Sequence, residues 1–504
     1  MLSFAEIFTT NMVLQRRKPV PVWGTAEAGK QITVTVGSET YRTTADISGK
    51  WCVELNPREA GGSYSLELSD GTELIRLEDI LFGDVFLAGG QSNMEFPLCD
   101  SRGARRAVSE SDLPSVRFCR IPHRALPEDA PDIPAHWEKC SPETSGSHSA
   151  IAYWFARRIS ESQGVPVGIV ECCWGGTSVA CWMSVERLKR MQVGTRILYD
   201  FDATVGDKSE ADYHVELAGY WKRYDAWFAD VEAYRGEHPH AAQEEIHRAC
   251  GYCPWPQPLG HSSPFRPGGL YATMVEKLFP LALRGVLFYQ GESDGIRCRD
   301  YAELLSAMIG EWREGFRDDE LPFLLCQLPM YCEASDYAAQ KDDKSWAILR
   351  EQQEKVSRTV ANVGLIVLLD CGEFDNIHPA EKQLPGERLA RKARQMLYGE
   401  DIPADGPVLR SARRYADSLE LRFFHTAGSL ELRDVSAGSF ELAGTDGVYC
   451  PASVRVSGDT LILTCAQVSE PITVRYAWQN YGMVCLYDAV GLPARPFRTD
   501  WQKI

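Results

Sequence analysis

The residues best suited to carry out chemistry in this chain follow a short apolar run. Residues 84–88 predict a buried strand, and the sequence Gly89-Gly90-Gln91-Ser92-Asn93-Met94 comes directly after it. Two glycines allow the backbone to turn sharply there, so the Ser92 hydroxyl can be exposed as a nucleophile. The motif is not G-x-S-x-G, because position 94 is Met, and this argues against an ordinary α/β-hydrolase. Taken alone, the same residues also fit a polar turn without chemistry.

Three later strand ends carry comparable polar sequences. The strands predicted at 167–170, 285–289 and 364–369 are followed by Trp174-Gly175-Gly176-Thr177, by Gln290-Gly291-Glu292-Ser293-Asp294 and by Asp375-Asn376-Ile377-His378-Pro379. Ligands of an open parallel sheet bind at the carboxyl ends of its strands. We therefore expect the four loops to meet at one site, although each alone also fits an ordinary turn or helix entry.

Together these loops contain what an ester-cleaving serine needs. A serine hydroxyl requires a base, and the imidazole of His378 is suitable near pH 7. Asp375, three residues earlier, is placed to orient that imidazole and to stabilise its charged form. The developing oxyanion needs donors, and the backbone amides of Ser92 and Gly176 and the side-chain amide of Gln290 can supply them.

The elements that must position these loops fall into three regions. Residues 1–80 show alternating strands and predict a β-sandwich module. Residues 81–400 alternate strands with helices, which indicates βαβ units and a mainly parallel sheet, interrupted around 190–268 by an insertion rich in Tyr, Trp, His and Pro that could cover a site. Residues 401–504 return to alternating strands and predict a second β module.

Composition narrows the possible functions. A net charge of −17 and a pI near 5.2 argue against a nucleic-acid or anionic-membrane surface. The N-terminal residues show no signal-peptide pattern, so we expect a cytoplasmic protein, and the 16 cysteines are too sparse for a disulfide scaffold. A single C-x-x-C at Cys250 and Cys253 is weak support for a zinc or redox site, and we expect neither metal nor cofactor.

The ordered combination of blocks resembles the SGNH-type hydrolases, and in particular the sialate O-acetylesterase family. The resemblance includes Asn11-Met12-Val13-Leu14-Gln15, Leu270-Tyr271-Ala272-Thr273-Met274 and Gly491-Leu492-Pro493, so it spans nearly the whole chain. It implies a flavodoxin-like three-layer α/β/α SGNH domain flanked by N-terminal and C-terminal β-sandwich-like modules. It also implies removal of O-acetyl groups, with 9-O-acetyl favoured, from sialic acids as small-molecule substrates.

Carried over block by block, the resemblance assigns the site residues. Ser92 becomes the nucleophile, His378 the base, Asp375 its orienter, and Ser92, Gly176 and Gln290 the oxyanion donors. Possible substrate contacts are Gln91, Trp174, Glu292 and Arg350, the last through the sialate carboxylate. Asp294 departs from the Asn that family patterns often have, and no role follows for it.

Two other functions remain open from the sequence. The same machinery could act on another acetylated glycan, such as acetyl-xylan. Alternatively, the β modules could make the chain a carbohydrate-binding scaffold with a vestigial site, although the complete set of site residues speaks against this. The sequence does not determine the oligomeric state.

Overall fold

The N-terminal strands form two small sheets in the computed structural model, which describes residues 1–130, 133–435 and 438–500. One sheet contains β1 (Ser3–Phe4), β3 (Val20–Thr25) and β6 (Lys50–Leu55). In the other, β4 (Gln31–Val36) pairs with β5 (Glu39–Thr44) and β7 (Gly61–Ser69). Every second residue of β4 and β6 is buried, which confirms the alternation seen in the sequence.

One long strand, β8 (Leu74–Gly90), connects this region to the rest of the chain. Its first half pairs with β7, its middle with β2 (Val13–Gln15), and its last seven residues pair in parallel with strands of the central sheet. Burial along β8 changes from alternating to continuous at Phe82, as expected where a strand becomes covered on both faces. The strand therefore leaves the N-terminal module and ends at Gly90, next to Ser92.

The central sheet has the strand order β10-β9-β11-β8-β12-β13-β14. All neighbouring pairs from β9 to β14 are parallel, and β10 is an antiparallel edge strand. The bounds are β9 (Leu113–Arg120), β10 (Trp137–Cys140), β11 (Val167–Cys173), β12 (Gly285–Tyr289), β13 (Phe323–Cys326) and β14 (Val363–Ile366). The chain continues from β8 to one side and later returns to its other side, so a topological switch point lies at the carboxyl end of β8.

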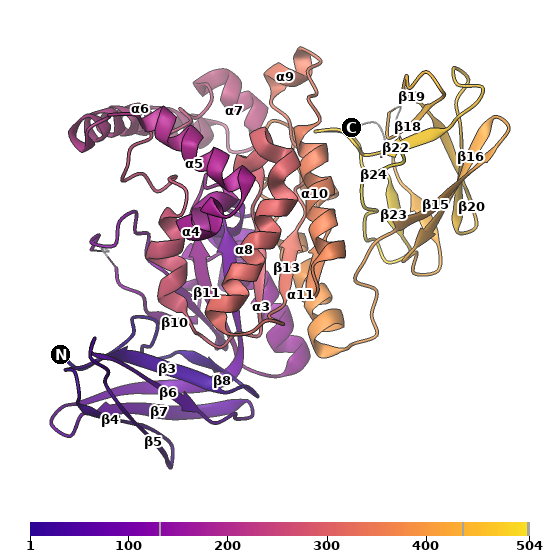
Figure 1. Cartoon of the computed structure of the whole chain (residues 1–504). Helices are drawn as coiled ribbons and strands as arrows, with labels where there is room; N and C mark the ends of the chain where they lie inside the picture. The colour runs from indigo at the N-terminus through magenta and orange to yellow at the C-terminus, as the bar shows by residue number, and fades with distance from the viewer. Residues whose placement is uncertain (131–132, 436–437, 501–504) are drawn as a thin grey trace.

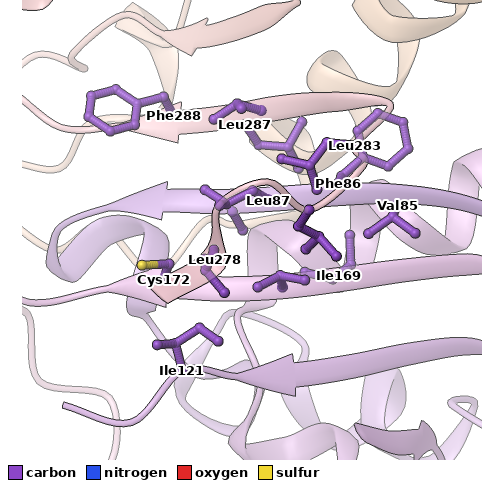
Figure 2. Packing of buried hydrophobic residues seen from close by; sticks show 14 of the residues in the cluster. Val85, Phe86, Leu87, Ile121, Ile169, Cys172, Leu278, Leu283, Leu287 and Phe288 are labelled. Carbon is purple, nitrogen blue, oxygen red and sulfur yellow. The ribbon is translucent and has the colours of Figure 1, made fainter. Parts of the chain in front are cut away.

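Helices cover this sheet and enclose an apolar core. α3 (Ala150–Gln163) packs against β9, β11 and α11 (Gln383–Tyr398), while α10 (Ser345–Thr359) packs against β14 and α8 (Tyr301–Phe316). Figure 2 shows how apolar side chains of β8, β11 and β12 fill the space around the sheet, among them Phe86, Ile169 and Leu287. These elements agree with the alternation of strands and helices predicted for residues 81–400, although nothing in the sequence indicated β9, β10 or α11 individually.

The C-terminal strands pack around a second apolar core, which also includes Met330, Val367 and Leu369 of the central region. They form the sheets β15-β16-β21-β20, β19-β18-β22-β24 and β17-β23. Their bounds are β15 (Val408–Tyr415), β16 (Ser418–Phe424), β17 (Leu430–Leu432), β18 (Phe440–Ala443), β19 (Cys450–Pro451), β20 (Ser453–Ser457), β21 (Thr460–Thr464), β22 (Thr473–Tyr476), β23 (Leu486–Asp488) and β24 (Phe497–Arg498). The fold is thus a mixed α/β architecture with several sheets, as predicted.

The segment between α3 and β12 contributes further helices. Short α4 (Val185–Lys189) is followed by α5 (Gln192–Val205), α6 (Glu210–Glu237) and α7 (Gln243–Cys250). Figure 1 shows α6 and α7 at the end of the molecule opposite strands β4, β5 and β7. Among the described residues, no helix has the length and apolar character needed to cross a membrane.

Candidate active site

Ser92 lies at the switch point, immediately after β8. It is the first residue of the short helix α1 (Ser92–Glu95) and its side chain is half-buried. Gly90 has φ = +135°, and a Cβ atom there would lie only 2.0 Å from the carbonyl oxygen of Tyr289 in β12. Only glycine fits this turn, which presents the Ser92 hydroxyl at the edge of the sheet.

The structure brings His378 to Ser92 across 286 residues of sequence. Nε2 of His378 lies 2.8 Å from Oγ of Ser92, which is hydrogen-bond distance. The side chain of Asn376 accepts a hydrogen bond from the His378 amide at 3.0 Å, and Nδ2 of Asn93 donates to the carbonyl oxygen of Ile377 at 2.9 Å. The loop of the base is thus tied to the loop of the serine.

The surroundings of His378 favour its neutral form. Although part of the side chain remains exposed, crowding by protein atoms and the nearby Lys382 ammonium lower the pKa of His378 to about 4. The imidazole is therefore neutral near pH 7 and can accept a proton from Ser92. Its Nδ1 atom makes no hydrogen bond to any residue that the structure describes.

Asp375 does not contact His378 in this structure. Its Oδ2 lies 2.9 Å from Nδ1 of His247, and its Oδ1 accepts hydrogen bonds from the Tyr252 hydroxyl and the Ala334 amide, each at 2.9 Å. The spacing of three residues suggested an orienting carboxylate, but Asp375 is buried with φ = +54° and points toward the insertion. Its predicted contact with the base is therefore wrong, and its carboxylate instead holds α7.

Two backbone amides near Ser92 are available to an oxyanion. Gly175 follows β11, and a Cβ atom there would lie 3.3 Å from Cβ of Ser92, so the two loops touch. In the part of the chain that the structure describes, the amides of Ser92 and Gly176 form no hydrogen bond. The Gly175 amide donates to Oε2 of Glu95 at 2.8 Å, which fixes the glycine turn to the helix of the serine.

Gln290 is not free to act as an oxyanion donor. Its Nε2 lies within hydrogen-bond distance of Oε1 of Gln91, the carbonyl oxygen of Thr177 and Oδ2 of Asp294, and the whole side chain is buried. The predicted role of Gln290 is corrected accordingly, because two amide hydrogens already face three internal acceptors.

Asp294 and Gln91 have bracing roles in the same network. Asp294 also accepts from the Val179 amide at 2.9 Å, and burial raises its pKa to about 6. Gln91 is buried and accepts from the amides of Gly291 and Ser293 at 3.3 and 3.4 Å. Through these hydrogen bonds, Gln91 and Asp294 connect the loops that follow β8, β11 and β12.

Glu292 belongs to a second buried network. Its Oε1 accepts from Nδ2 of Asn93 at 2.6 Å, while Oδ1 of Asn93 accepts from Nζ of the buried Lys382 at 2.6 Å. Burial raises the pKa of Glu292 and lowers that of Lys382 to about 8. Glu292 therefore supports Asn93, and its contact with substrate stays a prediction.

Arg350 lies away from the site, and its predicted substrate contact is wrong. The side chain is 0% exposed, and its guanidinium donates to the carbonyl oxygens of Pro329 and Gln479. Because Gln479 belongs to the C-terminal region, Arg350 joins that region to α10. Arg350 lies inside α10, and its neighbours in the sequence gave no sign of this long-range contact.

Trp174 does lie at the site, on the loop that contacts Ser92. Its ring stacks on His123 with centroids 4.1 Å apart and an interplanar angle of 9°. Nε2 of His123 lies 3.0 Å from Oε1 of Glu95, so the exposed His123 and the half-buried Trp174 border the glycine turn.

A second histidine, His148, is buried next to the residues that support the serine loop. Its Nδ1 and Nε2 lie 3.0 and 3.1 Å from carboxylate oxygens of Glu171 and Glu138. Burial opposes its charge, but the attraction of Glu171 and the hydrogen bonds to both carboxylates raise the pKa of His148 to about 9. The neighbouring Ser149 hydroxyl donates to the carbonyl oxygen of Met94 at 2.6 Å, so this charged cluster supports α1.

The insertion supplies site residues that sequence reasoning did not identify individually. His247 and Tyr252 bind Asp375, and Trp255 contacts the glycine turn: a Cβ atom at Gly176 would lie 2.3 Å from its ring. The aromatic composition of the insertion was the only signal in the sequence, because nothing in it shows which aromatic residue meets which loop.

No group of three or more His, Cys, Asp or Glu side chains suited to a metal ion occurs among the described residues. The site contains a serine, an imidazole and two unpaired backbone amides. This arrangement can perform nucleophilic cleavage of an ester.

Comparison with known proteins identifies the family. The model of the carbohydrate esterase family of sialic acid-specific acetylesterases matches residues 82–200 and 261–395, which include all four loops and leave out most of the insertion. Sialate O-acetylesterases of Mus musculus and Homo sapiens are 27% and 26% identical to the chain, covering 98% of it and 93% and 92% of their own lengths.

A solved structure agrees with these sequence comparisons. A carbohydrate acetylesterase from Xanthomonas citri is 29% identical, with 99% of each chain covered and a TM-score of 0.79. The resemblance seen in the sequence is confirmed: the chain belongs to the family of sialic acid-specific acetylesterases.

Proposed function

We propose that this carboxylic ester hydrolase removes O-acetyl groups from sialic acids, with the 9-O-acetyl group favoured, by a serine mechanism. The observation that carries the mechanism is the 2.8 Å contact between His378 Nε2 and Ser92 Oγ. The family and its sialate O-acetylesterase relatives support the substrate class.

In the first half of the reaction, Ser92 Oγ attacks the acetyl carbonyl carbon while His378 Nε2 accepts its proton. The carbonyl oxygen becomes an oxyanion, which the amides of Ser92 and Gly176 are placed to stabilise. When the tetrahedral intermediate collapses, the sugar oxygen leaves with the proton from His378 and the acetyl group stays on Ser92.

In the second half, water attacks the acetyl group of the acetyl-enzyme. His378 accepts one proton from this water, the same two amides stabilise the new oxyanion, and collapse returns that proton to Ser92 as acetic acid leaves and then ionises to acetate in solution. With no carboxylate on its Nδ1 atom, the imidazole owes its orientation to the anchored loop, through Asn93 and Asn376.

We also propose the flavodoxin-like three-layer arrangement of SGNH hydrolases for the region around 81–400, with flanking β-sandwich-like modules at 1–80 and 401–504. The strand order β11-β8-β12-β13-β14 supports this arrangement. Of these strands β8 comes first in the chain, and it lies between β11, the second, and β12, the third, which is the order of flavodoxin-like sheets. The last four residues of the C-terminal region lie outside the described part of the chain.

Ser92→Ala tests the mechanism. The variant should fold like the wild type, as judged by circular dichroism, and should release acetate from p-nitrophenyl acetate at least about 10³-fold more slowly. Labelling of the wild type, but not of the variant, by a fluorophosphonate would locate the nucleophile. Acetate release by the variant at a rate close to that of the wild type contradicts the mechanism.

The substrate is tested separately. We expect a higher kcat/KM for 9-O-acetylated sialic acid than for acetyl-xylan, and the reverse preference would favour the second acetylated glycan considered from the sequence. The cytoplasmic location stays a prediction, which fractionation of cells producing the full chain would check.

A further inference from the structure

One short segment of the insertion contacts both loops that face the ester. The Tyr252 hydroxyl donates to Asp375, three residues before His378, at 2.9 Å. Three residues later, Trp255 lies against Gly176, whose amide is one of the two unpaired donors. Residues 252–255 therefore extend from the side of the base to the side of the oxyanion.

The segment is held in place from several directions. His247 on α7 binds Asp375 at 2.9 Å, and the Trp227 indole on α6 donates to the carbonyl oxygen of Gly251 at 2.9 Å. The Trp255 ring packs edge-on against Phe265 with centroids 5.6 Å apart. Prolines at 254, 256 and 258 further restrict the backbone. A substrate would thus meet a surface that is already ordered.

Despite these contacts, both aromatic rings keep large exposed areas. Tyr252 is 43% exposed and Trp255 is 53% exposed. An exposed indole against the glycine turn is well suited to the apolar C–H face of a sugar ring, because a flat aromatic face offers contact area at little entropic cost.

We propose that residues 252–255 form a sugar-binding wall of the active site, and that Trp255 packs against the sugar ring that carries the acetyl group. This inference rests on the proposed function and adds a specificity-determining element to it. The family model matches residues 82–200 and 261–395, so the wall comes from a part of the chain that the family pattern does not specify.

The wall acts on the sugar and not on the acetyl group, so its removal should depend on the substrate. Trp255→Ala should lower kcat/KM for 9-O-acetylated sialic acid by about 10-fold, mainly through a higher KM, as loss of about one favourable aromatic contact predicts. Its kcat/KM for p-nitrophenyl acetate, which has no sugar, should stay within about twofold of the wild type. Trp255→Phe should recover most of the sugar-ester activity.

Trp221→Ala is the matched control. Trp221 lies on α6 of the same insertion and is 42% exposed, but its ring contacts are with Tyr220 and Tyr224. This variant should leave activity on both esters unchanged. An equal loss on both esters in Trp255→Ala would show that Trp255 only supports the glycine turn, and no loss on either would remove it from the site; both results overturn the proposal.

The experiment separates failure of the proposed sugar-binding role of residues 252–255 from failure of the proposed function. If the function fails, the wild type itself leaves acetylated sialic acid intact. The same proteins are therefore also assayed on acetylated xylo-oligosaccharide, where the wall predicts the same selective loss for Trp255→Ala relative to p-nitrophenyl acetate. If Trp255→Ala shows no selective loss of kcat/KM on any sugar ester that the wild type cleaves, the proposed sugar-binding role of residues 252–255 is overturned.

Discussion

The contact between Glu95 and Gly175 makes a quantitative prediction about the oxyanion site. Glu95 accepts the Gly175 amide at 2.8 Å, and the next amide, that of Gly176, is one of the two unpaired donors near Ser92. Replacement of Glu95 by Ala removes the acceptor without touching either donor. The glycine turn then loses the contact that fixes it to α1, and the Gly176 amide points at the oxyanion for a smaller fraction of the time.

The size of the effect is set by the lost hydrogen bond between Glu95 and the Gly175 amide, because both oxyanion donors remain in the variant. Complete loss of an oxyanion donor costs on the order of 10²- to 10³-fold in kcat. A hydrogen bond to a charged group contributes about 1.5–3 kcal/mol, and the lower value applies because the Glu95 side chain is 34% exposed and solvent screens it. Since about 1.4 kcal/mol corresponds to a factor of ten, Glu95→Ala should lower kcat by about 10-fold.

Steady-state kinetics on p-nitrophenyl acetate would measure this effect. KM should change little, because the ester carbonyl carries less charge in the ground state than the oxyanion does in the transition state. Glu95→Gln is the matched control, because its amide oxygen can still accept from Gly175, and it should keep most of the activity. A kcat for Glu95→Ala within twofold of the wild type would refute the reasoning, and equal losses in both variants would point to the charge of Glu95 instead of its hydrogen bond.

Three further predictions concern charged side chains: His378 and His148 near the serine loop, and Arg350 away from the site. The folded pKa of His378 lies near 4 and the base must be neutral, so activity in the pH profile of kcat/KM should be lost only well below pH 6.5. Lys382→Met removes a repulsive charge and should shift this acidic limb to higher pH. An acidic limb at pH 6.5 in both proteins contradicts this prediction. His148 has a folded pKa near 9, above its ordinary value of 6.5, so its stabilisation is complete below pH 6.5 and lost as pH rises through 9. Urea unfolding should show the wild type losing about 3 kcal/mol between pH 6 and 9.5 relative to His148→Gln, and parallel losses would contradict the ion-pair assignment. Arg350→Met should lower the melting temperature by several degrees and leave KM for sialic acid esters unchanged, whereas a raised KM would return Arg350 to the substrate site.

Local patterns in the sequence predicted much of the architecture. Alternation in residues 31–36 and 51–55 predicted half-buried strands, and β4 and β6 have that burial. The apolar spacing in residues 151–159 predicted a helix, which α3 confirms with the Ser149 side chain as its cap. These features are local, because burial periodicity and capping depend on residues a few positions apart.

The predicted site residues come together where backbone turns decide the geometry. Ser92 and Gly176 lie at strand ends, and His378 reaches Ser92 as expected. The predictions failed for Asp375, Gln290 and Arg350, whose side chains find partners in distant elements.

What the sequence determined by itself is the set of loops and the family to which the chain belongs, because glycine turns and strand ends leave a pattern in adjacent residues. What only the tertiary structure decided is the partner of each polar side chain. Asp375 shows the difference: its spacing from His378 predicts a contact, yet its carboxylate binds His247 and Tyr252, more than 120 residues away. A buried carboxylate pairs with the donors that the fold brings within hydrogen-bond distance, and chain separation does not reveal which donors those are.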